Sequence, residues 1–283
     1  MRDRPKYINI QGNLIDLEVP KIMGILNITP DSFYKGSRYK KKHEILSAAF
    51  KMLDDGADFL DVGGYSSRPG AEDISIEEEK KRVLNAIRLI SAEFPKAVIS
   101  VDTFRADIAR DAIYDYGAHM INDISGGDGD SEMFPLIEKL NVPYIMMHMK
   151  GNPRTMQDNP VYDDVVADIL KWFGGKIVRL RSAGVKDIII DPGFGFGKTT
   201  EQNLEILSHL EYFLKLRCPI LVGLSRKSFI GNILGAPVNE RLYGSLGAAA
   251  VAIYHGAHIL RVHDVAEHRQ LTALIDRTLV NSV

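Results

Sequence analysis

Three polar side chains at the ends of separate apolar runs could together recognise a flat, nitrogen-rich ring. Asp102, Asn122 and Asp191 each stand near the C-terminal end of such a run. A carboxylate accepts two parallel hydrogen bonds from an exocyclic amine and the neighbouring ring N–H, and burying it without partners is costly. If the three side chains converge, we expect them to bind a heterocycle with an amino-amide edge and to reject analogues lacking these donors. Asp61 occupies a similar place, and its residue type fits a ligand contact and a capped turn equally well.

A second set of residues is suited to an anion. Arg261 and His263 are two positions apart on one run, so on a strand their side chains would share a face. Arg68, in the Gly- and Ser-containing loop 63–70, could reach the same place. Two arginines, a histidine and nearby hydroxyl groups fit a phosphate or a pyrophosphate. The amide oxygen of Asn27 would then suit a hydrated Mg²⁺ that arrives with the pyrophosphate.

Two further segments could complete the walls of such a site. The Gly-rich stretch 191–198 resembles a phosphate-binding loop but lacks P-loop spacing, so we expect it to lay a Phe over a planar ligand. Lys227 could bind a ring carbonyl, and the helix start at Ser228 could hold a carboxylate. His148 has no second His or Cys at ligand spacing, so we interpret it as a buried, hydrogen-bonded histidine rather than a zinc or iron ligand.

These residues lie on a repeating pattern of short apolar runs. Most of the runs are rich in Val and Ile, as strands buried on both faces are, and they occupy 22–29, 58–64, 98–104, 120–126, 143–149, 187–193, 219–225 and 258–264. The longer segments between them mix polar and apolar residues, and several end at a Gly, as crossover helices do. The pattern predicts an α/β protein, a (β/α)₈ TIM barrel whose active site forms at the C-terminal ends of the strands. Residues 1–20 precede the barrel and predict a short N-terminal β-hairpin that plugs its other end.

Length and composition narrow the possible partners. We expect one domain over residues 1–283, with the barrel at 21–283, because this length is usual for a single TIM barrel. A formal net charge of −2 gives no electrostatic reason to expect nucleic acid or membrane binding. The single cysteine, Cys218, suits a reducing compartment, and we found neither a membrane-length apolar run nor a signal-peptide core. We therefore expect small-molecule substrates, no nucleic acid or membrane partner, and a cytoplasmic location.

From residue 22 to residue 279 the chain resembles the dihydropteroate synthase family, the pterin-condensing enzymes of folate biosynthesis that sulfonamides inhibit. The resemblance rests on motifs that occur in order: MGILNITPDSF at 23–33, GGxSxRPG at 63–70, VDT at 101–103, IND at 121–123, MHMxGxP at 147–153, DPGFGFGK at 191–198, SRKS at 225–228 and RVHDV at 261–265. It implies a transferase that joins 6-hydroxymethyl-7,8-dihydropterin pyrophosphate to 4-aminobenzoate, giving 7,8-dihydropteroate and pyrophosphate. It also implies Mg²⁺ as cofactor and a homodimer.

The resemblance assigns a role to each motif residue. Those that would hold the pterin or line its slot are Asp102, Asn122, Asp191, Lys227, Met146, Phe196 and Gly223. Those that would hold the pyrophosphate are Asn27, Ser67, Arg68, Arg261 and His263, with Asn27 also the ligand of the metal. The 4-aminobenzoate would lie against Phe33, Pro69 and Ser228.

Several positions depart from the family's usual pattern, and two other functions remain open. Ser67 stands where the family usually has a Thr and keeps its hydroxyl group. Tyr65 stands where the family usually has a Glu, and Lys35 stands where it usually has an Asp, so the substrate mouth would be more positive if Lys35 faces it. A methyltransferase that passes a methyl group from a folate to a corrinoid could use the same pterin-binding acids, but it has no need of the Arg261–His263 pair. A barrel that binds a pterin without catalysis is the other alternative, and the full set of anion-binding residues argues against it.

Overall fold

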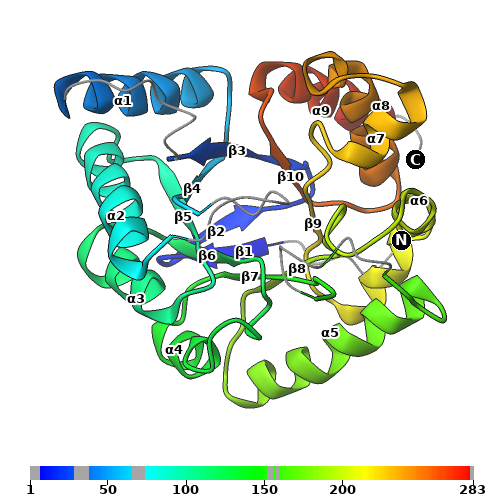
Figure 1. Ribbon diagram of the computed structural model, residues 1–283, viewed down its shortest axis with the longest axis horizontal. Coiled ribbons are helices and arrows are strands. Elements are labelled where there is room, and N and C mark those ends of the chain that lie inside the picture. Colours follow the sequence, from blue (N-terminus) through cyan, green and yellow to red (C-terminus); the bar gives the residue numbers. More distant parts are fainter. Residues whose placement is uncertain (1–6, 29–37, 66–73, 152–155, 157–159, 281–283) are drawn as a thin grey trace.

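The protein is a closed barrel of parallel strands surrounded by helices (Figure 1). The computed structural model describes residues 7–28, 38–65, 74–151, 156 and 160–280. Within them, the barrel strands are β3 (Lys21–Asn27), β4 (Phe59–Gly63), β5 (Val98–Asp102), β6 (Met120–Asp123), β7 (Tyr144–Met147), β8 (Ile188–Asp191), β9 (Leu221–Val222) and β10 (Ile259–Val262). They pair in parallel in the order β8-β7-β6-β5-β4-β3-β10-β9, and a bridge between Ile190 and Ile220 joins the two ends of the sheet. The predicted TIM barrel is confirmed.

Helices connect the strands and form the outer layer (Figure 1). They are α1 (Arg38–Asp54), α2 (Ile76–Glu93), α3 (Ala106–Asp115), α4 (Met133–Leu140), α5 (Val165–Ser182), α6 (Thr200–Ser208), α7 (Ser228–Leu234), α8 (Leu242–Tyr254) and α9 (Val265–Val280), with short 3₁₀ turns at Leu210–Leu216 and Val238–Glu240. Ser75, Asp164 and Thr199 cap the starts of α2, α5 and α6 by accepting backbone N–H bonds. None of the helices in the described ranges is long and apolar enough to cross a membrane.

The predicted N-terminal hairpin is present and fills one end of the barrel. Strands β1 (Tyr7–Ile10) and β2 (Asn13–Asp16) pair antiparallel around Gln11 and Gly12, whose φ angles of 50° and 88° suit a two-residue hairpin turn. Ile8, Ile10 and Leu17 pack with an inward-facing layer from the barrel: Met23, Phe59, Met120, Ile145, Ile189, Leu221 and Ile259. The hairpin therefore seals the N-terminal end of the barrel with apolar side chains.

This layer determines which residues face the opposite end. Successive side chains of a strand point to opposite faces, so the residue two positions beyond each plug contact also faces inward. Two positions beyond Phe59, Met120, Ile145, Ile189, Leu221 and Ile259 stand Asp61, Asn122, Met147, Asp191, Gly223 and Arg261. The apolar plug is thus followed, one inward layer further on, by a layer in which Asp61, Asn122, Asp191 and Arg261 are polar, while Met147, Gly223 and Ile25, two positions beyond Met23, are not. Side chains at the alternate positions of the strands, such as Leu60 and Met146, point outward and pack against the helices.

Candidate active site

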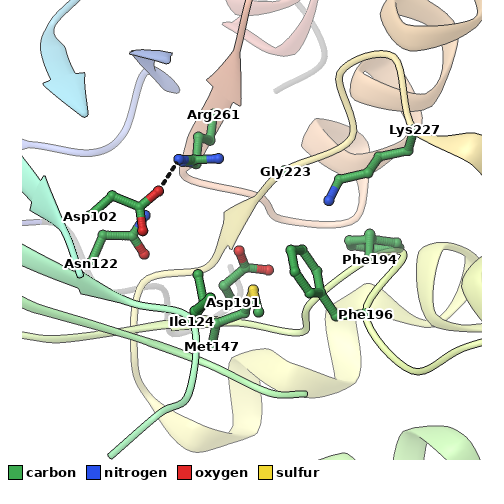
Figure 2. A pocket seen from close by; sticks show the side chains of 10 residues that line it. All are labelled: Asp102, Asn122, Ile124, Met147, Asp191, Phe194, Phe196, Gly223, Lys227 and Arg261. Carbon is green, nitrogen blue, oxygen red and sulfur yellow. Dashed lines mark hydrogen bonds and ion pairs between the residues drawn. The ribbon is translucent and has the colours of Figure 1, made fainter. Parts of the chain in front are cut away.

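A pocket that is partly open to solvent lies at the C-terminal ends of the strands (Figure 2). Its lining comes from five strands and from the segments that follow β6, β8 and β9: Asp102, Asn122, Ile124, Met147, Asp191, Phe194, Phe196, Gly223, Lys227 and Arg261. Asp102 and Asn122 lie on one side, and Asp191, the two Phe rings and Lys227 lie on the other (Figure 2). The pocket can therefore offer a planar ligand both hydrogen-bond acceptors and ring contacts.

Arg261 joins two carboxylates on the side of Asp102 and Asn122. Its Nε donates to Oδ2 of Asp61 at 2.6 Å, and its Nη2 donates to Oδ2 of Asp102 at 2.5 Å. Although burial alone would lower the pKa of Arg261, the two carboxylates raise it above its ordinary value. Burial raises the pKa of Asp102, while the charge of Arg261 favours its ionised form. Asn122 donates from Nδ2 to the same oxygen of Asp61 at 2.9 Å.

Asp191 and Lys227 lie across the pocket from this group (Figure 2). Asp191 is buried, and its Oδ1 accepts a hydrogen bond from the backbone N–H of Gly193 at 2.8 Å. Burial raises the pKa of Asp191, against the effect of that N–H and of Lys227. Burial also lowers the pKa of Lys227 to about 8, and its Nζ lies 4.2 Å from the ring centre of Phe196. The side chain of Lys227 is thus held over an aromatic face, with its donors at the pocket.

The Gly-rich segment after β8 is held in shape by Lys198. This buried ammonium donates to the backbone oxygens of Gly193 at 3.0 Å and Phe196 at 2.9 Å, and it lies 3.1 Å from Nδ1 of His148. Burial lowers the pKa of Lys198 to about 7, and burial together with the Lys198 charge lowers that of His148 to about 2. His148 is therefore the buried, hydrogen-bonded histidine that its sequence context predicts. Lys198 serves the shape of the segment, because it does not line the pocket.

Three further predicted site residues, His263, Asn27 and Ser228, lie at or just beyond strand ends or at a helix start, outside the lining of the pocket. His263 follows β10, and its Nδ1 lies 3.0 Å from Oγ of Ser225. Desolvation of the ring and the neighbouring Arg261 charge lower the pKa of His263 to about 4, so at neutral pH it can serve an anion as a neutral donor. Asn27 is half-buried at the end of β3, in register with Gly63, and β3 is paired with β10. Ser228 is exposed at the start of α7.

Most of the predicted pterin residues lie together, and one does not. Asp102, Asn122, Asp191, Lys227, Phe196 and Gly223 all line the pocket. The prediction for Met146 is wrong, because this residue points outward into the core between sheet and helices, and Met147 lines the pocket instead. Arg261, which the sequence groups with the anion-binding residues, lies in the same pocket as the pterin set. Phe33, Lys35, Ser67, Arg68 and Pro69 lie outside the described residues.

Sequence reasoning missed three lining residues, and for Asp61 it left a ligand contact and a capped turn equally open. Ile124, Met147 and Phe194 line the pocket, and Asp61 stands behind it. The two-residue periodicity of the strands could have identified Met147 and Asp61, since both follow a plug residue by two positions. Tyr65, at the position where the family usually has an acid, packs edge-on against Phe104 with ring centres 5.2 Å apart.

Comparisons with known proteins agree with the motifs. The family model described as pterin binding enzyme matches residues 23–263. The dihydropteroate synthase of Escherichia coli is 42% identical over 271 residues, which are 95% of this chain and 95% of that protein.

Two solved structures have the same fold. The dihydropteroate synthase of Yersinia pestis, in complex with a sulfonamide drug, matches with a TM-score of 0.90 at 38% identity, and the match covers 97% of this chain and 99% of that one. The dihydropteroate synthase of Xanthomonas albilineans, with 4-aminobenzoic acid, matches with a TM-score of 0.89 at 37% identity, over 99% of each chain. All three proteins are similar to this chain over nearly its full length.

Proposed function

The chain belongs to the pterin-binding enzymes and, among them, to the dihydropteroate synthase family, and we propose that the pocket at the mouth of its barrel binds the pterin substrate. The protein is an enzyme, a transferase of folate synthesis. It condenses 6-hydroxymethyl-7,8-dihydropterin pyrophosphate with 4-aminobenzoate and releases 7,8-dihydropteroate and pyrophosphate.

The observation that supports the pterin site best is the convergence of three acceptor side chains in one pocket. Asp102, Asn122 and Asp191 come from β5, β6 and β8 and line the same pocket as Lys227. A pterin has an amino group and ring N–H donors along one edge and a carbonyl oxygen next to them. These three side chains match the donors, and the ammonium of Lys227 matches the carbonyl. Phe196 and the Arg261 guanidinium offer flat surfaces to the ring.

The chemical step that follows needs no strong base in the protein. The amino group of 4-aminobenzoate is already neutral near pH 7, and the slow event is cleavage of the C–O bond to pyrophosphate. The pterin ring releases electrons toward the departing methylene carbon, so the protein's part is to position the two substrates and stabilise the leaving anion. We assign the anion to the rim, where Arg261 supplies charge and His263 supplies a hydrogen bond, with Asn27, Ser67 and Arg68 completing its site.

The same rim has a suitable donor for Mg²⁺. Mg²⁺ prefers oxygen ligands and keeps several of its waters, so one amide oxygen and the pyrophosphate oxygens suffice to place it. Asn27 presents such an amide at the end of β3, beside the strand that leads to His263. When bound there, Mg²⁺ would offset the charge that develops on the leaving pyrophosphate.

The 4-aminobenzoate site lies next to the pterin pocket in this proposal. Ser228 begins α7, and the backbone N–H groups at that helix start can hold the substrate carboxylate. Phe33 and Pro69 would form the walls of this site. We place the enzyme in the cytoplasm, which the buried, free thiol of Cys218 supports, since a reducing compartment suits such a thiol.

We also propose that the protein is a homodimer that associates through α7 and α8. These helices contact each other and expose large apolar side chains: Ile233, Leu234, Tyr243, Val251 and Tyr254, with Tyr243 84% exposed. Clustered exposed apolar residues are typical of an association surface.

A direct assay tests the activity. The purified protein is mixed with the pterin pyrophosphate, 4-aminobenzoate and Mg²⁺, and dihydropteroate and pyrophosphate are both quantified. We expect the two products in equal amounts and a loss of turnover when Mg²⁺ is chelated. Absence of dihydropteroate would contradict the function, and release of pyrophosphate without 4-aminobenzoate would contradict the coupling of the two substrates.

A further inference from the structure

Asp61 is a carboxylate that lies behind the wall of the pocket and contacts two of its residues. It stands on β4 and is fully buried. Its Oδ2 accepts hydrogen bonds from Nε of Arg261 at 2.6 Å and from Nδ2 of Asn122 at 2.9 Å. Asp61 is not among the residues that line the pocket, so any effect it has on a ligand must act through Arg261 and Asn122.

The contact with Asp61 determines which way the amide of Asn122 faces. A carboxylate oxygen that is paired with a guanidinium can only accept hydrogen bonds. The group of Asn122 that meets it must therefore be the NH₂ and not the oxygen, whichever way the amide is drawn. With its nitrogen held at Asp61, the amide turns its oxygen to the other side, and Asn122 lines the pocket there.

The same carboxylate oxygen also fixes the guanidinium of Arg261. Because Nε is held by Asp61 and Nη2 by Asp102, the plane of the guanidinium is determined at two points. In Figure 2, Arg261 reaches down from β10 to Asp102, beside Asn122. One atom of Asp61 therefore orients two pocket residues that come from different strands.

A purely stabilising role accounts poorly for Asp61. Its second oxygen, Oδ1, is buried and has no hydrogen-bond partner among the described residues. Burying a charged group with one oxygen unpaired costs free energy, and replacing buried ion pairs by apolar residues is often neutral or stabilising. The feature that an apolar residue could not reproduce is the orientation of Asn122 and Arg261.

We propose that Asp61 is a positioning residue that makes the pocket selective for an amino-bearing ring. By holding the NH₂ of Asn122, it keeps position 122 an acceptor, in line with the acceptors Asp102 and Asp191. The inference rests on the proposed pterin site. In an Asp61→Asn variant, the new amide can donate to the oxygen of Asn122, and Asn122 can then turn its own NH₂ toward the pocket. The site would tolerate a carbonyl where it otherwise requires an amine.

The test compares two ligands that differ in this one group. 6-Hydroxymethylpterin carries an amine at position 2, and 6-hydroxymethyllumazine carries a carbonyl there. In calorimetric titrations we expect the wild type to bind the pterin more tightly than the lumazine. In Asp61→Asn the ratio of the two affinities should fall by about 10- to 100-fold, which corresponds to one buried polar group left unpaired. An undiminished preference in Asp61→Asn would overturn the proposal.

The matched control is Asp58→Asn. Asp58 directly precedes β4, so it lies near the opposite end of the same strand, and it is also paired with an arginine, Arg269, at 2.5 Å. It should keep the wild-type ratio of the two affinities, because it contacts no pocket residue. If the wild type itself binds neither ligand, the proposed pterin site fails, and this result differs from a change in preference.

A reciprocal exchange provides the second variant. Asp61→Asn combined with Asn122→Asp keeps the number of carboxylates and reverses the direction of the hydrogen bond between the two positions. Position 122 again presents an acceptor to the pocket, so the double variant should regain at least about tenfold of the lost preference, although both residues have changed. A double variant no more selective than Asp61→Asn would contradict the inference. Because charge and hydrogen bond are kept, we expect the double variant to fold even if the single variant folds poorly, and it should then prefer the pterin to the lumazine as the wild type does; a double variant without this preference would contradict the inference.

Discussion

At the scale of single residues, Asp191 is the clearest test of the pterin site. Its Oδ1 is occupied by the N–H of Gly193, so we expect its other oxygen to accept a donor from the pterin edge. Asp191→Asn replaces a carboxylate with a group that can present an N–H to that donor, and pterin binding should weaken by about 2–4 kcal/mol. Calorimetric titration with a pterin analogue measures the loss. Asp187→Asn is the control, because Asp187 precedes the same strand and contacts the hairpin through Asn9. Wild-type affinity in Asp191→Asn would remove this residue from the site.

His263 tests the assignment of the anion to the rim. Because its pKa is lowered to about 4, the ring should act as a neutral donor to the pyrophosphate and contribute no positive charge at pH 7. His263→Ala should reduce kcat by about 100-fold, the effect of removing one donor to a developing anion, and leave the affinity for a pterin without pyrophosphate unchanged. Equal losses for the bare pterin and its pyrophosphate would place His263 in the pterin pocket instead.

His148 links the site to the pH dependence of folding. Its pKa is lowered from about 6.5 to about 2 in the folded protein, so below pH 6.5 the unfolded chain binds a proton that the folded chain does not. The stability present above pH 6.5 is therefore lost progressively as the pH falls toward 2. Between pH 7.5 and pH 5, His148 should lower the free energy of unfolding by on the order of 2 kcal/mol. The substitution His148→Gln should remove that part of the pH dependence. Urea unfolding at both pH values measures it, with the exposed His43→Gln as control.

At the scale of elements, the segment after β8 depends on Lys198. Lys198→Met leaves the carbonyls of Gly193 and Phe196 without their ammonium donor, so Phe196 should lose its fixed position at the pocket. We expect pterin affinity to fall by about tenfold, and amide exchange at Gly195 and Phe196 to quicken. Lys186→Met, at an exposed lysine just before the same strand, is the control. Unchanged exchange in Lys198→Met would show that the segment keeps its shape without this residue.

The elements were largely predictable from the sequence, and the contacts among their ends were only partly so. The apolar runs and the glycines that follow the helices mark local preferences, so the strands form at the predicted runs and the helices form in the segments between them. Met146 was misplaced because an apolar run buried on both faces shows no alternation that would tell inward from outward. The pairing of Arg261 with Asp61 joins residues 200 positions apart, and it exists only once the ring closes. The sequence could identify Arg261 and Asp61 as candidate site residues from their types, but it could not show that they pair with each other.

At the scale of the whole molecule, the exposed apolar face of α7 and α8 leads to a prediction about assembly. Tyr243→Glu places a charge where the proposed dimer would bury an aromatic ring, so the protein should shift to a monomer in sedimentation experiments. Tyr114→Glu, at a 64% exposed tyrosine on α3, should leave the assembly unchanged. A wild-type protein that sediments as a monomer would contradict the dimer. Pterin binding should survive in both variants, because the described residues that line the pocket lie outside α3, α7 and α8.

The hairpin that seals the barrel has a consequence for how the molecule is made. Its residues are synthesised before the barrel strands, yet its apolar side chains rest on a layer that includes Leu221 and Ile259, and Asn9 binds Asp187 from 178 positions away. On the ribosome the hairpin therefore lacks its packing partners until most of the chain has emerged. Until then, the side chains of Ile8 and Ile10 stay in contact with water. Contacts so distant in sequence slow folding. Completion of the fold is thus postponed until after translation of β10, and during this interval the nascent chain presents an apolar ribbon that chaperones can bind.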